Sequence, residues 1–163
     1  MSETTASAAP QNVFDLLQRI ESSWSAFLIT LEDLTEDQLM EPGAVGEWSL
    51  KEVLVHLCDF ERVFNYRALR FSRGDGTPVE AFEQDPYIAA SEANERPLEN
   101  IVGELLSLRA ATILHFASMS ETMLDRAGAA GGNPVSVRAL WFIIAGHCEG
   151  HLEDLRERFG RPH

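Results

Sequence analysis

The sequence has little positive charge, little cysteine and no long apolar run. Of its 163 residues, 26 are acidic and 13 are lysine or arginine, with Lys51 the only lysine, so the net charge at pH 7 is −13. A surface this acidic repels phosphate backbones and anionic lipids. No apolar run reaches the roughly 18 residues that a membrane-spanning helix needs. We therefore expect neither a nucleic-acid partner nor a membrane partner.

Disulfide and targeting signals are also scarce. Two cysteines do not make a disulfide framework in such a chain, and a reducing cytoplasm is the simplest location. The opening MSETTASAAP has neither a positive start nor an apolar stretch, so we expect residues 1–11 to be a disordered arm and not a signal peptide. Residues 12–160 have the size of one domain, and 45% hydrophobic residues is a globular composition.

The apolar pattern predicts an all-α fold with four amphipathic helices. Apolar residues recur at three- and four-residue intervals in residues 12–33, in residues 50–73, from Pro97 to Met119, and in residues 136–159. Capping boxes mark a short turn at Thr35–Gln38 and the start of the second helix at Ser49–Glu52. We find no strand pattern and no internal repeat.

The lengths of the connections indicate how these helices are ordered. Residues 74–96 form a much longer link than the other two, with Pro78 and Pro86 inside it. A link of over twenty residues can run the length of a bundle and leave the second and third helices parallel. The sequence thus favours a four-helix bundle of up-down-down-up topology with a long crossover, although a loop of this length could also be a lid.

The last helix carries a pair of histidines with metal-ligand spacing. His147 and His151 are four residues apart, so they lie about 40° apart on one helix face and can reach one divalent ion. The alternative interpretation is that they are two surface or half-buried histidines on a helix edge and bind no metal. Glu149 lies near the opposite side of the helix from His151, so we do not expect it to act as a general base.

A third histidine can complete the site. If the second and fourth helices are antiparallel, His56 comes level with His147 and His151, and all three lie at the border of their apolar faces. His115 is about 25 Å from the start of the third helix, too deep to join them in the parallel-crossover topology. In an up-down-up-down bundle His115 would instead be a rival ligand.

Two segments resemble a known family. Trp48-Ser-Leu-Lys-Glu-Val-Leu-Val-His56-Leu57 and Ala145-Gly-His-Cys-Glu-Gly-His151-Leu152 are similar to the signature regions of the DinB/YfiT-like superfamily of metal-dependent proteins. Asp85-Pro86, Leu108-Arg109 and Arg126 are also placed as in many members. The likeness covers residues 13–159. It implies an up-down-down-up four-helix bundle, often a homodimer, with a divalent metal, commonly nickel or zinc, held by His56, His147 and His151.

The chemistry of such a site limits its function without fixing it. Three neutral imidazoles leave the ion its full charge and an open position, so a water or thiol there loses its proton more easily. Characterised relatives of the superfamily include transferases and isomerases that use small thiol cofactors, and others are described as hydrolase-like. We therefore expect a metal-dependent enzyme acting on a small molecule, with the alternative of a non-catalytic dimeric bundle that binds a small molecule. The net charge opposes a third possibility, DNA binding.

Other polar residues near the histidines have both functional and structural interpretations. Asp154 and Asp59 could orient a ligand ring, but the favoured interpretation of both is a solvated carboxylate on a helix. Arg109 and Arg126 could bind an anionic group of a substrate, or have ordinary helix-surface and loop roles. Cys148 lies in the apolar face and is expected to be a buried filler. The remaining residues of this kind are Cys58, beside a predicted ligand, and Trp24, Trp48 and Trp141, expected to pack in the core.

Overall fold

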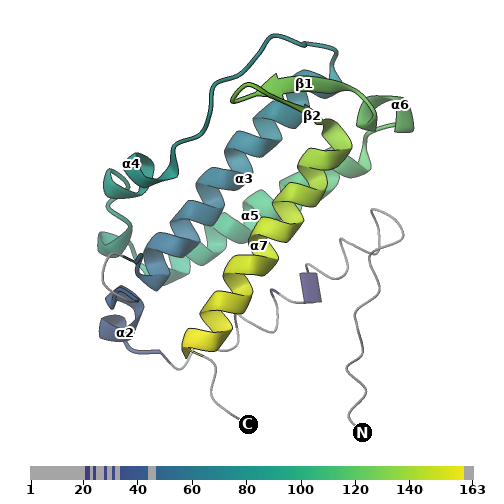
Figure 1. Ribbon diagram of the computed structural model, residues 1–163. Coiled ribbons are helices and arrows are strands. Elements are labelled where there is room, and N and C mark those ends of the chain that lie inside the picture. The colour runs from purple at the N-terminus through teal and green to yellow at the C-terminus, as the bar shows by residue number, and fades with distance from the viewer. Residues whose placement is uncertain are drawn as a thin grey trace, which may run out of the picture.

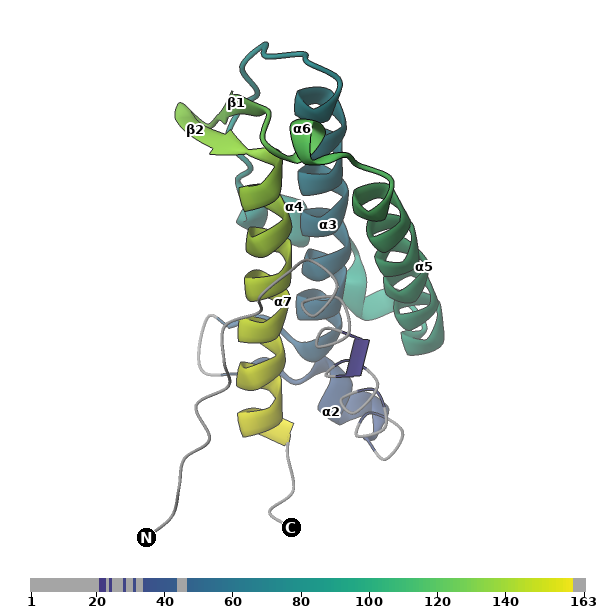
Figure 2. The same ribbon diagram turned by 90° about the vertical axis from the view of Figure 1, so that its right-hand side faces the viewer.

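A computed structural model describes residues 21, 22, 24, 28, 31, 34–43 and 47–159 of the chain. The predicted arm and most of the predicted first helix lie outside these residues. Three long helices lie side by side in the part described: α3 (Leu50–Ser72), α5 (Leu98–Ala117) and α7 (Val137–Phe159). Figure 1 shows the three helices, and the view in Figure 2 shows α3 between the other two.

Helices α3 and α5 run in the same direction. Arg62 of α3 forms an ion pair with Glu104 of α5 at 2.6 Å, and Asn65, further along α3, contacts His115, further along α5. Contacts that advance together along both helices require parallel axes. The predicted parallel crossover is therefore present, while the direction of the first helix lies outside the described residues.

Helix α7 runs antiparallel to α3. Near the start of α3, the carbonyl oxygen of Trp48 accepts a hydrogen bond from Arg158, near the end of α7. Further along α3, Phe60 stacks on His147, which comes earlier in α7. The two helices that carry the predicted ligands thus match in level as the sequence required.

The ends of α3 follow from local sequence signals. Ser49 accepts a hydrogen bond from the backbone of Glu52, and the Glu52 side chain accepts one from the backbone of Ser49, which completes the predicted capping box. At the other end Gly74 has a positive φ of 84°, and Asp75 N–H bonds back to the carbonyl of Arg70 at 3.0 Å. This is a Schellman motif, which needs a left-handed residue and so favours glycine.

The crossover between α3 and α5 is more ordered than a plain loop. It contains the short helix α4 (Gln84–Ala89) and the 3₁₀ turn η1 (Ala93–Glu95), and Val79 exchanges backbone hydrogen bonds with the segment that follows α5. Before α3, the predicted capping box at Thr35 opens the short helix α2 (Glu36–Met40). Figure 1 shows α2 at one end of the three long helices and the hairpin described next at the other.

The prediction of no strands was wrong at one place. After α6 (Glu121–Leu124), β1 (Ala127–Ala130) pairs antiparallel with β2 (Asn133–Ser136). Gly131 and Gly132 both have positive φ, as the two-residue turn of a tight hairpin requires. The sequence does not predict this hairpin, because four-residue strands are too short to show an alternating pattern.

Close packing and capping join this hairpin to the helices. A Cβ atom at Gly128 would lie 2.2 Å from the ring of Phe71, so only glycine lets β1 approach α3 this closely. Ser136 accepts a hydrogen bond from the N–H of Ala139 and directly precedes α7. The core between the helices is mainly apolar. No helix of the part described is both long and apolar enough to cross a membrane.

Candidate metal centre

The three predicted histidines converge between α3 and α7. Nε2 of His56 lies 3.0 Å from Nε2 of His147, which lies 3.2 Å from Nε2 of His151. One ring nitrogen from each residue lies within 4.8 Å of the others. Two nitrogens that ligate one ion at about 2.1 Å with bond angles near 90–110° are about 3.0–3.4 Å apart. The His56–His147 and His147–His151 separations therefore match those of ligands that share one divalent ion.

Aromatic side chains hold two of the imidazole rings. The ring of Phe60 stacks on that of His147 with centroids 3.6 Å apart and planes at 5°, and Trp48 lies 4.8 Å from the ring of His56. The side chain of His56 is fully buried, while His147 and His151 are half-buried. The cluster thus extends from the α3–α7 interface to the surface.

The surroundings keep the imidazoles unprotonated. Burial and the neighbouring His151 lower the pKa of His56 to about 4. Burial and both other histidines lower the pKa of His147 to about 3. Burial also lowers the pKa of His151, although Asp154 acts in the opposite direction. Neutral imidazoles at pH 7 present free lone pairs, so this donor set fits a divalent cation.

Among the described residues, the second ring nitrogen of two of these histidines lacks the hydrogen bond that it makes in many metal sites. In the described part of the chain, Nδ1 of His56 and Nδ1 of His147 are buried and have no hydrogen-bond partner. A ligating histidine commonly donates from this atom to a carboxylate or carbonyl, which fixes the ring. Here ring packing and the placement of the helices must orient the rings instead.

An open pocket of about 1000 Å³ borders the cluster at His151. Trp48, Val53 and Leu155 give it apolar surface. Its charged lining consists of five carboxylates and one guanidinium, from Glu41, Glu47, Asp85, Asp154, Glu157 and Arg158. A small molecule in this pocket would therefore touch the cluster while surrounded mainly by negative charge.

Several other candidates lie away from the cluster. His115 contacts Asn65 through Nδ1 at 3.1 Å and is not one of the converging histidines, as expected for the parallel crossover. Asp59 lies 3.5 Å from Arg62 in an ion pair on the surface of α3. Arg126, between α6 and β1, donates to the carbonyl of Ser72 and so joins this segment to the end of α3. None of these side chains lines the pocket.

The remaining candidates are the two cysteines and the three tryptophans. Cys58 and Cys148 are both buried free thiols. Burial raises the pKa of Cys58 to about 12 and that of Cys148 to about 11, so neither is a thiolate at neutral pH. Trp24 and Trp141 are in the core as predicted, whereas Trp48 also lines the pocket.

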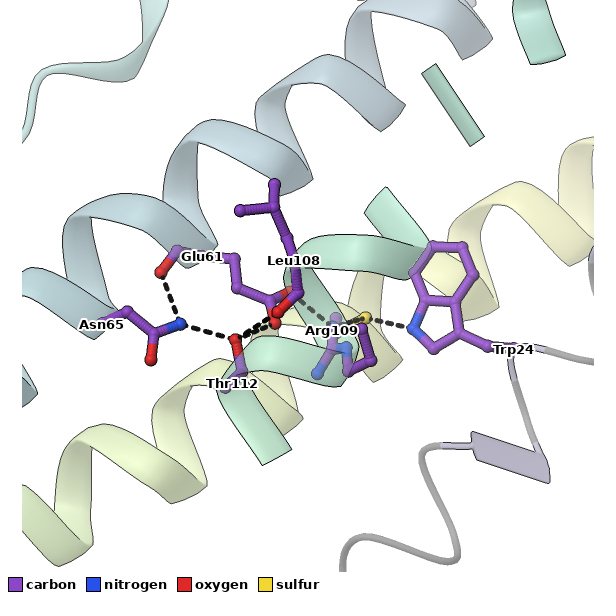
Figure 3. Close-up of polar contacts among 7 residues, drawn as sticks. Trp24, Glu61, Asn65, Leu108, Arg109 and Thr112 are labelled. Atoms are coloured by element: carbon purple, nitrogen blue, oxygen red, sulfur yellow. Dashed lines mark hydrogen bonds and ion pairs between the residues drawn. The ribbon is translucent and has the colours of Figure 1, made fainter. Parts of the chain in front are cut away.

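Sequence reasoning missed a buried polar cluster beside the histidines. Glu61 of α3 lies 3.1 Å from Arg109 of α5, and the hydroxyl of Thr112 donates to Glu61 (Figure 3). Both charged residues occur at core spacing in otherwise apolar helix faces, Glu61 four residues after Leu57 and Arg109 four after Leu105. Opposite charges in two apolar faces are the signal that could have revealed this pair. Of the two expected roles of Arg109, a place on the helix surface is wrong, because its side chain is buried and pairs with Glu61. Binding of an anionic group by Arg109 stays a prediction.

Known proteins share this sequence pattern and fold. "Putative metal-dependent hydrolase OB0413" of Oceanobacillus iheyensis is 22% identical over 148 residues, which cover 90% of this chain and 84% of that protein. YfiT of Bacillus subtilis, described as a probable metal-dependent hydrolase with an unusual four-helix bundle topology, superposes with a TM-score of 0.81 at 15% identity, covering 99% of this chain and 95% of YfiT.

A second solved structure is more distant. The DinB-like protein YjoA of Bacillus subtilis superposes with a TM-score of 0.58 at 17% identity, covering 90% of this chain and 92% of YjoA. At these identities the two structures show a shared fold, the four-helix bundle. The family model of the DinB superfamily matches residues 19–155, which include all three converging histidines. The chain therefore belongs to the DinB superfamily.

Proposed function

We propose that this chain is a divalent-metal-dependent enzyme that activates water or a thiol for hydrolysis of, or transfer to, a small molecule. The observation that carries the proposal is the position of three unprotonated imidazoles at the edge of an open pocket. Three protein ligands leave a coordination position open, which is the arrangement of catalytic rather than structural zinc sites. The names of the Oceanobacillus iheyensis relative and of YfiT, both described as metal-dependent hydrolases, support the same chemistry.

His56, His147 and His151 would hold the ion, and nickel or zinc is the metal we propose because both accept imidazole ligands. A divalent ion supplies Lewis acidity, which makes water or a small thiol co-substrate a stronger acid near pH 7. Trp48, Val53 and Leu155 would bind the apolar part of a substrate. His151, which lines the pocket, would orient the ion toward it.

The lining of the pocket also limits the charge of the substrate. Five carboxylates surround it, and Arg158 donates hydrogen bonds to the backbone carbonyls of Trp48 and Glu41. A pocket lined by one sign of charge attracts the opposite sign and repels its own. We therefore propose a neutral or cationic small molecule as substrate, and not an anion.

The proposal includes the assembly and location of the protein. We propose a homodimer in the cytoplasm, with no nucleic-acid or membrane partner, on the basis of the family resemblance, the reduced cysteines and the net charge. Light scattering during size-exclusion chromatography measures the oligomeric state directly. A non-catalytic small-molecule-binding bundle is the competing function, and the open pocket beside the histidines is what favours the enzyme over it.

Elemental analysis and activity assays on the same preparation test the function. We expect about one equivalent of nickel or zinc per chain after reconstitution, and hydrolysis of model esters or amides, or thiol transfer, that is lost on chelation and restored by the metal. Metal binding without any turnover across neutral and cationic substrates would favour the binding bundle. A protein that binds no divalent metal would contradict both the centre and the proposed reaction.

A further inference from the structure

The buried cluster around Arg109 contacts both helices that carry the converging histidines. Nη2 of Arg109 lies 3.1 Å from Oε2 of Glu61 and donates to Sγ of Cys148 at 3.0 Å (Figure 3). Glu61 lies five residues after His56 on α3, and Cys148 directly follows His147 on α7. We name this contact chain, Glu61–Arg109–Cys148, the α3–α7 bridge. It passes through α5, which carries none of the three histidines.

Further hydrogen bonds fix the members of the bridge. The hydroxyl of Thr112 donates to Oε1 of Glu61 and accepts from the side-chain amide of Asn65 at 2.5 Å. On the α7 side, the indole N–H of Trp24 also donates to Sγ of Cys148. Figure 3 shows these side chains pointing toward one another from α3, α5 and the segment that bears Trp24. Glu61 is therefore held by Thr112 as well as by Arg109, whereas Nη2 is the nitrogen through which Arg109 contacts both Glu61 and Cys148. Nε and Nη1 of Arg109 are buried and have no hydrogen-bond partner among the described residues.

Stability alone does not explain a bridge of this kind. Glu61 is 1% exposed and Arg109 is 7% exposed, so both charges are removed from water. Well-packed apolar residues of similar volume often serve stability as well as a buried ion pair, or better. What the bridge adds is direction. Its ion pair and its hydrogen bond join particular atoms and so oppose the sliding of one helix along another, whereas apolar contacts are non-directional.

The histidine cluster needs this kind of fixation. Nδ1 of His56 and Nδ1 of His147 have no hydrogen-bond partner among the described residues, so the relative placement of α3 and α7 positions the two rings. Their Nε2 atoms are 3.0 Å apart. A shift of about 1 Å between the helices would spoil such an arrangement, since functional sites need side chains placed to within about 0.5 Å.

We propose that Arg109 is a positioning residue for the three-histidine centre, fixing α3 against α7 through Glu61 and Cys148. The inference rests on the proposed metal function for its purpose, but the contacts it describes involve no metal and can be measured in metal-free protein. Arg109 touches neither the histidines nor the pocket at His151 in the structure. Its effect on the site therefore passes through the positions of the two helices.

A double substitution, Glu61→Leu with Arg109→Met, removes the bridge without leaving one charge buried alone. We expect a folded bundle whose affinity for Zn²⁺ or Ni²⁺ falls about 10- to 100-fold, the usual range for supporting residues of metal sites. With Co²⁺ as the probe, the visible absorption spectrum should also change. The control is Arg62→Met, which removes an α3–α5 ion pair that does not reach α7 and should leave both readings unchanged.

A second set of variants applies if the double variant does not fold. Cys148→Ala removes the acceptor on α7, while Cys148→Ser retains one and should restore much of the affinity. Cys58→Ala is the matched control, because Cys58 is an equally buried thiol near His56 and lies outside the bridge. Loss of affinity in Cys148→Ala alone supports the positioning role, and equal losses in both alanine variants contradict it.

Nuclear magnetic resonance of the imidazole rings in the metal-free protein separates this inference from the proposed function. We expect the ring signals of His56 and His147 to shift in the folded bridge variants and not in Arg62→Met or Cys58→Ala. If the wild-type protein bound no metal, the proposed function would fail while these signals still tested the bridge. Unchanged ring signals and unchanged metal affinity in the folded double variant would overturn the inference.

Discussion

His151 is the one of the three converging histidines that lines the pocket, and it contributes little to the core. We expect His151→Ala to weaken the binding of the divalent ion by at least about 100-fold. This is more than the 10- to 100-fold loss that is usual when a residue that supports a metal ligand is replaced. The bundle should stay helical because its stability rests on the apolar helix faces. Metal content and circular dichroism of the same purified variant provide the measurement.

A matched histidine substitution serves as the control for this prediction. His115→Ala replaces another half-buried histidine, one that contacts Asn65 and lies outside the cluster, so metal content should not change. Full metal occupancy in His151→Ala would show that this residue is not a ligand. Global unfolding would show instead that it is a structural residue.

The lowered pKa values of His56 and His147 predict how acid affects the metal-free protein. An unfolded histidine has a pKa of about 6.5, whereas His56 is at about 4 and His147 at about 3 in the folded chain. As pH falls below about 6.5, the unfolded state takes up protons first. The free energy of unfolding is therefore fully retained above pH 6.5 and falls progressively toward pH 4.

Urea denaturation of the metal-free protein at pH 7, 6 and 5 measures this dependence, in a range where most carboxylates stay ionised. The variant His147→Gln removes one of the two strongly shifted groups, so its stability should depend less on pH over the same range. An identical dependence in the variant and the wild type would show that these histidines are not held neutral by the fold.

At the scale of elements, the long helices could be predicted where local signals and periodicity agree. The capping box at Ser49 and the apolar face that follows define α3 almost to the residue, and the length of the link after it predicts the parallel α5. The hairpin could not be predicted in this way. Its strands have four residues each and depend on the close contact between Gly128 and Phe71, which sequence spacing does not reveal.

The candidate site could also be predicted only in part from the sequence. Convergence of His56, His147 and His151 followed from helix geometry, because the antiparallel order of α3 and α7 fixes their levels. Binding of a metal there remains a prediction. The bridge through Arg109 was missed because a buried ion pair joins residues from separate helices, and each of them alone resembles an ordinary charge on a helix.

The contact of the hairpin with α3 gives a prediction at this scale. In Gly128→Ala the new Cβ would lie 2.2 Å from the Phe71 ring, so the hairpin or the ring must move, at a cost of about 1–3 kcal/mol in unfolding free energy. Gly103→Ala is the control, because this exposed position within α5 has no neighbour within 4 Å. That change should stabilise the protein by about 0.5–1 kcal/mol. Thermal or urea denaturation measures both, and equal effects would contradict the proposed close approach.

For the whole molecule, the excess of acidic residues in the chain is also present around the pocket that is proposed to bind the substrate. Acidic residues outnumber basic ones 26 to 13, yet the pocket beside His151 has five carboxylates and one guanidinium. The ratio of acidic to basic side chains is thus higher around the pocket than in the chain as a whole. A charged ligand approaching it meets the field of the entire molecule and then that of the lining, and both have the same sign.

This field predicts which small molecules bind and how salt affects them. Of two aromatic ligands of similar size, one an amine cation and the other a carboxylate, the cation should bind more tightly. Raising the ionic strength from 0.01 M to 0.15 M shortens the screening length from about 30 Å to about 8 Å. Affinity for the cation should therefore fall with salt while affinity for the anion rises. Isothermal titration calorimetry with metal-free and metal-loaded protein measures both.

A single lining carboxylate can be tested in the same experiment. Asp85 is exposed at the start of α4 and lines the pocket, so Asp85→Asn should weaken binding of the cation by about two- to fivefold, as expected for one solvated charge pair. Glu121→Gln is the matched control, because Glu121 lies on α6 and outside the pocket lining. Since most of the attraction at low salt comes from the charge of the molecule as a whole, the control should alter it only slightly. Tighter binding of the carboxylate than of the amine would mean that the lining does not select the ligand, and the substrate would then have to be sought among anions.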